Sequence, residues 1–156
     1  MRKTFLVLLT AAFASGCSTQ FSGNFEFRNR SETELFVSVS GFERNPPVGL
    51  LYPNGTAGSS IGPMSLPTKA TIFWSETHDV IIKTEHGSSF SRDVLNQPHL
   101  ICFSPATNGQ SIATMADKHR YTSTFSILSI SNWSPKAEIV FEYESNHTWK
   151  VFCEHL

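Results

Sequence analysis

Apolar and polar residues alternate with a period of two through much of the chain. The alternation is clearest in four segments, residues 24–28, 35–40, 138–144 and 149–154. A strand shows this pattern when one of its faces packs against a core and the other faces water. Three further segments are more continuously apolar, as expected for central strands: 70–75, 80–84 and 100–103. The pattern therefore predicts a chain that is rich in strands.

Segments with helical periodicity are scarce. Only residues 91–96 and 111–118 resemble short helical turns, and neither keeps an apolar period of three to four residues over three turns. Residues 121–130 form one long run whose apolar side switches between Ile127 and Leu128, which predicts a bulge. We predict an all-β fold with little helix, namely an antiparallel, immunoglobulin-like β-sandwich of about eight or nine strands.

Residues 44–69 differ in composition from the rest of the chain. They hold five of the eight prolines and enclose the apolar tract 48–52. One interpretation is an edge strand whose neighbouring prolines prevent further strand addition. The other is a partner-binding loop, because long irregular connections are often functional. In that case the anchor residues are Leu50, Leu51 and Tyr52.

The N-terminus has the organisation of a signal peptide. Arg2 and Lys3 precede a nine-residue apolar run, which is much shorter than the roughly 20 residues that a membrane-spanning helix needs. The sequence Ala-Ser-Gly-Cys then ends at Cys17. It resembles the lipobox of bacterial lipoproteins, although Ala14 stands where that pattern prefers Leu. An ordinary secretory signal that ends near a cysteine is the alternative.

The lipobox resemblance implies cleavage before Cys17 and acylation of Cys17. Ser18 follows where an Asp would act as a retention signal, which implies the periplasmic face of the outer membrane of a Gram-negative cell. We therefore divide the chain into a signal peptide at 1–16, a lipid-anchored tether at 17–23 and one β-sandwich domain at 24–156.

The three cysteines are interpreted through the same resemblance. If Cys17 carries lipid, Cys102 and Cys153 are left as a pair, and an oxidising compartment favours a disulfide between them. The alternative is a zinc site in which His99 and His155 join the two thiols. The two interpretations are mutually exclusive.

Charge excludes some partners. The whole chain has a formal net charge of −1, and loss of residues 1–16 leaves 10 basic and 13 acidic residues. No basic field is present that would attract nucleic acid or anionic lipid. Attachment to a membrane would therefore depend on the acyl chains, of which two are sufficient for stable anchoring.

Catalytic and cofactor motifs are absent from the sequence. Residues 55–60 are glycine-rich but lack the lysine of a phosphate-binding loop, and Glu142 and Glu144 are expected to lie on the solvent face of a strand. No serine or cysteine is placed in a recognisable nucleophile motif. We expect no enzyme activity, no cofactor and no metal.

These features predict a lipid-anchored binding protein that captures a protein partner. In size, compartment and strand content the chain resembles small periplasmic immunity-type lipoproteins, which neutralise toxins by covering their active sites. No motif is specific to that group. The alternative function is that of a structural or accessory lipoprotein in an envelope or secretion assembly.

Overall fold

A computed structural model describes residues 20–60, 62–83, 99–105, 110–127, 130 and 134–155. This part of the chain contains ten strands and no helix. The strands are β1 Asn24–Asn29, β2 Leu35–Ser40, β3 Gly49–Leu51, β4 Thr56–Ser60, β5 Lys69–Lys83, β6 Leu100–Pro105, β7 Gln110–Ala116, β8 Tyr121–Ser126, β9 Glu138–Glu144 and β10 Thr148–Glu154. The predicted all-β sandwich is confirmed.

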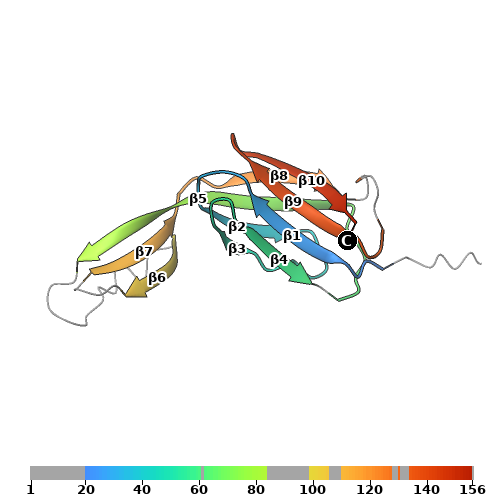
Figure 1. Cartoon of the computed structure of the whole chain (residues 1–156), viewed down its shortest axis with the longest axis horizontal. Coiled ribbons are helices and arrows are strands. Elements are labelled where there is room, and N and C mark those ends of the chain that lie inside the picture. Colours follow the sequence, from blue (N-terminus) through green and yellow to red (C-terminus); the bar gives the residue numbers. More distant parts are fainter. Residues whose placement is uncertain are drawn as a thin grey trace, which may run out of the picture.

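Two sheets pack face to face in the sandwich (Figure 1). The first has the strand order β10-β9-β1-β4. In the second, β3 pairs with β2, β2 with β5, and β8 with the other side of β5. The pair β1–β9 is parallel, which departs from the purely antiparallel sandwich that we expected. A parallel neighbour is possible because β1 and β9 are separated by most of the chain.

The core is aromatic and lies between the two sheets. Phe25, Phe27 and Phe141 are fully buried on the inner face of the first sheet, and Trp74 faces them from the second. The rings of Phe27 and Phe141 stack with centroids 4.9 Å apart. Burial of one such side chain stabilises a fold by about 2–3 kcal/mol. The alternation in the sequence therefore places the large side chains where they contribute most.

Strand β5 is long enough to belong to two parts of the molecule. Its 15 residues include segment 70–75 and residues 80–83 of segment 80–84, which we expected to form separate strands. Up to Glu76 it lies within the sandwich between β2 and β8. From Thr77 it pairs with β7, which in turn pairs with β6. This three-stranded part, residues 77–83 with β7 and β6, projects beyond the sandwich (Figure 1), and we call it the arm.

Two local predictions are changed by the pairing of strands. Residues 111–118 fall largely in β7, so the helical turn predicted there is wrong; pairing on both sides with β5 and β6 determines the conformation. Segment 44–69 contains the edge strand β3 and also β4, which pairs with β1, so the edge-strand interpretation of the apolar tract is confirmed. The predicted turn at 91–96 lies outside the described residues.

Candidate functional site

The arm carries most of the large apolar side chains that the described residues expose. Three of the five exposed large hydrophobic residues are Val80, Ile81 and Ile112, with exposed fractions of 42%, 63% and 39%. Ile81 and Ile112 lie directly opposite each other on β5 and β7, so their side chains share one face. Clusters of this kind are more informative than single exposed apolar residues.

Strand alternation defines the face that Ile81 and Ile112 share. Residues opposite one another in register point to the same side of the sheet, and the side changes with each residue along a strand. We call this side the arm face; its members are Asp79, Ile81, Cys102, Ser104, Ile112 and Thr114. The hydroxyl of Thr114 donates a hydrogen bond to Asp79 at 2.8 Å, which fixes the one acidic side chain of the face.

A groove joins the base of the arm to the sandwich. It has a volume of about 360 Å³ and is lined by the apolar side chains of Phe36, Phe73, Leu100 and Ile101 together with polar and basic ones. The guanidinium of Arg120 lies 4.6 Å from the centroid of the Phe73 ring. Odd-numbered residues of β5 share one side, so Phe73 in the groove lies on the same side of the sheet as the arm face.

The outer face of the first sheet has the opposite character, because it is covered by ion pairs. Arg28 donates hydrogen bonds to Glu26 and Glu154, and these bonds hold the pKa of both carboxyls below their usual value. Glu142 and Glu144 pair with Arg30 and Lys150, as expected for residues on a solvent face. The described side chains on this side of the sandwich are therefore mainly charged, and Arg28 also lies over the partly buried ring of Phe152.

One carboxyl on this outer face lacks a cationic partner among the ion pairs of the described residues. Partial burial, and then the negative charge of Glu26, raise the pKa of Glu138 above its usual value. Arg28 acts in the other direction but is engaged with Glu26 and Glu154. Glu138 is thus the residue of this face whose ionisation opposes folding.

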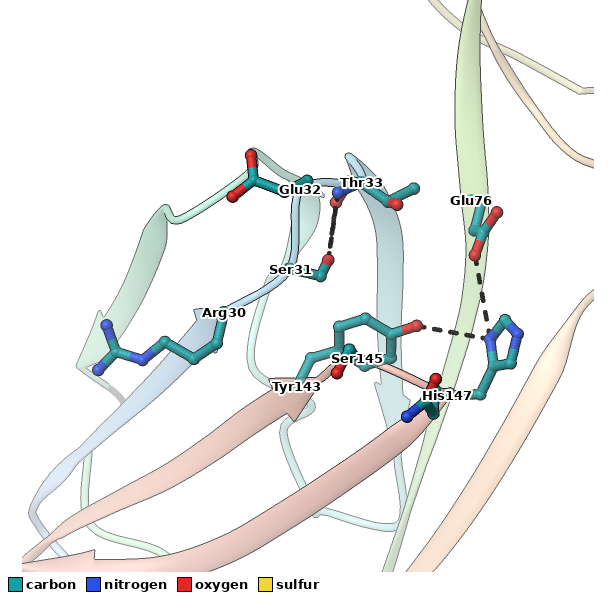
Figure 2. A pocket seen from close by; sticks show the side chains of 9 residues that line it. Arg30, Ser31, Glu32, Thr33, Glu76, Tyr143, Ser145 and His147 are labelled. Carbon is teal, nitrogen blue, oxygen red and sulfur yellow. Dashed lines mark hydrogen bonds and ion pairs between the residues drawn. The ribbon is translucent and has the colours of Figure 1, made fainter.

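A polar pocket of about 570 Å³ lies near the boundary between sandwich and arm. Figure 2 shows how the β1–β2 loop, Glu76 of β5 and the β9–β10 turn surround it. Nδ1 of His147 lies 3.4 Å from the hydroxyl of Tyr143 and 4.0 Å from a carboxylate oxygen of Glu76. Burial, followed by the charge of Glu76, raises the pKa of Tyr143.

The turn that presents His147 has an unusual backbone. Asn146 and His147 are consecutive residues in the connection 145–147, and their φ angles of 70° and 59° both lie in the left-handed region. Asn accepts this conformation readily, whereas the second position usually holds glycine. The imidazole of His147 stacks on the ring of Tyr121 with centroids 4.2 Å apart. This stack accounts for a histidine at a strained position.

Comparisons with protein-family models, with curated proteins and with solved structures found no match to this chain. Within the described residues no group of histidine, cysteine and acidic side chains is arranged to hold a metal ion. Nor does that part of the chain contain a helix long and apolar enough to cross a membrane.

The three residues proposed as partner anchors have different environments. Leu51 is 1% exposed and packs in the core, whereas Tyr52 is 61% exposed and Leu50 is partly exposed. Leu50 and Leu51 belong to the edge strand β3, which alternates its side chains between core and solvent. Only Leu50 and Tyr52 are accessible to a partner, and their role in binding stays a prediction.

The structure does not contain the disulfide that the cysteine count predicts. Cys102 and Cys153 are both free thiols. Cys102 is exposed on the arm, whereas Cys153 lies on β10 in the first sheet and packs against the core. Burial raises the pKa of the Cys153 thiol. Strand β6 lies in the arm and β10 in the sandwich (Figure 1). Cys102 and the preceding His99 are therefore apart from Cys153 and His155, and the described residues do not form the zinc alternative. Cys17 lies outside the described residues.

Sequence reasoning missed the arm face because its signal was assigned to a buried strand. Residues 80–82 are Val-Ile-Ile, a composition that is typical of a central strand. The useful signal was instead the pair of charges at Asp79 and Lys83 that bounds this apolar segment. Charged residues are seldom fully buried without a partner, so they indicate that both ends of this apolar segment reach solvent.

Proposed function

We propose that the chain is a lipid-anchored protein of the bacterial envelope that binds a protein partner through the arm face. The observation that carries the proposal is the exposure of Ile81 and Ile112 on one face of a projecting sheet. Exposed apolar surface costs about 25 cal/mol per Å² relative to its burial, so a contiguous patch favours association. The groove at the base of the arm extends this surface toward Phe36 and Phe73.

The direction in which the arm projects supports the same proposal. Phe21 is fully buried and exchanges two backbone hydrogen bonds with Met64, so the chain is already part of the sandwich four residues after Cys17. The start of β1 lies at the end of the sandwich away from the arm (Figure 1). A lipid on Cys17 would therefore hold the sandwich at the membrane and direct the arm toward the periplasm.

The test places a photo-crosslinking amino acid at Ile112 of the full chain in living cells. We expect a crosslink to one defined protein other than the chain itself. The matched control is Thr124, an exposed residue on the outer face of the sandwich in β8, which should give no such product. A soluble toxin as the partner favours an immunity role, and a membrane complex favours an accessory role. Equal crosslinking at both positions, or none at Ile112, would contradict the proposal.

A second measurement separates binding from folding. Ile112→Glu places a charge on the arm face at a position that is already 39% exposed. We expect this variant to lose the partner in co-purification while its thermal unfolding midpoint stays within a few degrees of the parent. Partner binding at the parental level would show that the arm face is not the contact.

A further inference from the structure

One edge of the arm has no strand paired with it in the described part of the chain. Strand β2 covers one side of β5 only as far as Glu76, where it pairs with Leu35. Beyond this point β5 pairs with β7 on its other side, from Thr77 to Lys83. Among the described residues no strand pairs with this side of residues 79–83, and an edge of this kind can accept a further strand.

The hydrogen bonds identify which residues present their backbone groups to this edge. The N–H of Thr77 donates to the carbonyl of Glu34 at 3.0 Å, so the groups of Thr77 point away from β7. In an antiparallel strand these directions alternate with each residue. Asp79, Ile81 and Lys83 thus direct their N–H and C=O groups to the open edge, whereas Val80 and its even-numbered neighbours bond to β7.

The residues along the open edge are complementary to themselves. Read in either direction, the segment Asp-Val-Ile-Ile-Lys begins and ends with opposite charges around an apolar centre. An antiparallel pair of two such segments, centred on Ile81 of each copy, places Asp79 of one opposite Lys83 of the other. The central residue of this register is also one whose backbone groups point to the open edge.

We propose that a second copy of this chain pairs with residues 79–83 of β5, in antiparallel orientation about a two-fold axis at Ile81. The pairing joins two arms into one six-stranded sheet and satisfies the backbone groups of Asp79, Ile81 and Lys83 in both copies. Other registers lose the match of charges: a shift of two residues sets Asp79 opposite Ile81. Because the contact is the same on both copies, it closes at a dimer.

The proposed pairing also changes the arm face. It brings the arm faces of the two copies side by side, so that Ile81 and Ile112 of both chains form one apolar surface. The exposed fraction of Ile81, 63%, is the largest among the exposed apolar residues of the described chain, and its side chain would meet its own counterpart. The pairing does not require the partner protein proposed above, and each can be tested without the other.

The test is disulfide crosslinking of the full chain in cells, in a Cys102→Ser background that removes the exposed native thiol. Directly opposed residues in a hydrogen-bonded pair have Cα atoms about 5.5 Å apart, which suits a disulfide. We expect Ile81→Cys to give a covalent dimer. Ile112→Cys is the matched control, because it lies on the same face but one strand further from the axis, and it should stay monomeric.

Charge reversal tests the register. Asp79→Lys sets two lysines opposite each other at both ends of the pair, and we expect about tenfold less crosslinking of Ile81→Cys. Adding Lys83→Asp reverses both charges and should restore the parental yield of covalent dimer.

Restoration of this yield is decisive, because a variant that merely misfolds would not be rescued by a second substitution. No dimer with Ile81→Cys, equal dimer at both cysteine positions, or failure of the rescue would overturn the proposal. If Ile81→Cys gives no dimer but the photo-crosslinking residue at Ile112 still captures a partner protein, only the dimer is overturned and the proposed function stands.

Discussion

The sandwich and the arm use apolar residues in opposite ways. In the sandwich the large side chains face inward between two sheets, and the outer face of the first sheet is covered by charges such as those of Arg28, Glu26 and Glu154. In the arm one face of a single sheet leaves Ile81 and Ile112 in contact with solvent. The same residue types therefore stabilise one region and are available for recognition in the other.

This contrast is a consequence of how far β5 extends. A sheet needs a second layer to bury its face, and β2 and β8 accompany β5 only within the sandwich. From Thr77 onward the strand continues with β7 and β6, and its odd-numbered residues, which lie on the outer side of the second sheet, form the arm face. Beyond Glu76, β5 carries two exposed large apolar side chains, those of Val80 and Ile81.

The largest expected effect comes from the sandwich core. Phe27 is fully buried and stacks on Phe141, so Phe27→Ala should lower the free energy of unfolding by about 3–5 kcal/mol. Ile81→Ala on the arm should change it by no more than about 0.5 kcal/mol, because that side chain is exposed. Urea denaturation of both variants measures the difference. Similar losses of unfolding free energy in the two variants would show that Ile81 contributes to a packed core, contrary to the contrast drawn between sandwich and arm.

Amide hydrogen exchange should show the same contrast at the backbone. Arm amides should exchange through opening reactions of lower free energy than those of β1 and β9, because fewer buried contacts hold the arm. Within the arm, the amides of Asp79 and Ile81 should exchange at least tenfold faster than the amide of Val80, because only Val80 bonds to β7. The sample is kept dilute so that the proposed dimer does not protect the open edge. Uniform exchange along residues 79–81 would contradict the assignment of the open edge.

The sequence predicted the sandwich better than the arm, for a physical reason. Alternation at Phe25 and Phe27, or at 139–143, identifies a strand with one buried face, and the structure buries those residues. Whether a continuous apolar strand such as residues 80–82 is covered depends on which other segments reach it, and this is a property of topology. β4 escaped prediction because residues 56–60 contain no large apolar side chain.

The polar pocket illustrates the same limit. Its walls come from the β1–β2 loop, from Glu76 and from the β9–β10 turn, which are far apart along the chain. No local pattern connects Tyr143 or His147 to Glu76. The turn itself could have been predicted from Asn146, but a histidine in place of glycine obscured it. Long-range pairing of strands is what brings these groups together.

A smaller effect is expected at the boundary between the two regions. His147→Gly relieves the left-handed backbone at the second turn position but removes the stack on Tyr121. Relief of the left-handed backbone is worth about 1 kcal/mol, whereas loss of the stack between His147 and Tyr121 at an exposed site costs about 0.5 kcal/mol. The variant should therefore be more stable by about 0.5 kcal/mol. Thermal unfolding measures the change. A clear loss of stability would mean that the imidazole joins β10 to the arm-bearing sheet more strongly than its contacts suggest.

The smallest effect concerns the charged outer face of the sandwich, and its sign depends on pH. The pKa of Glu138 is raised in the folded state, first by burial and then by Glu26. Its neutral form therefore stabilises the fold below the usual pKa of a glutamate, and that contribution is lost as the pH rises through the raised value. Glu138→Gln should stabilise the fold at pH 7 by less than about 0.5 kcal/mol, and have no effect at pH 4 or below.

Glu154 supplies the control of opposite sign on the same face. Its hydrogen bond with Arg28 lowers its pKa, so its contribution is present above the usual pKa of a glutamate and is lost as the pH falls through the lowered value. Glu154→Gln should thus destabilise the fold at pH 7 and become neutral in acid. Urea denaturation of both variants across this range gives two curves that diverge with pH in opposite directions. If the curves coincide, the ion pairs that cover this face do not discriminate between the two carboxyls, and the contrast between a charged sandwich face and an apolar arm face would rest on the arm alone.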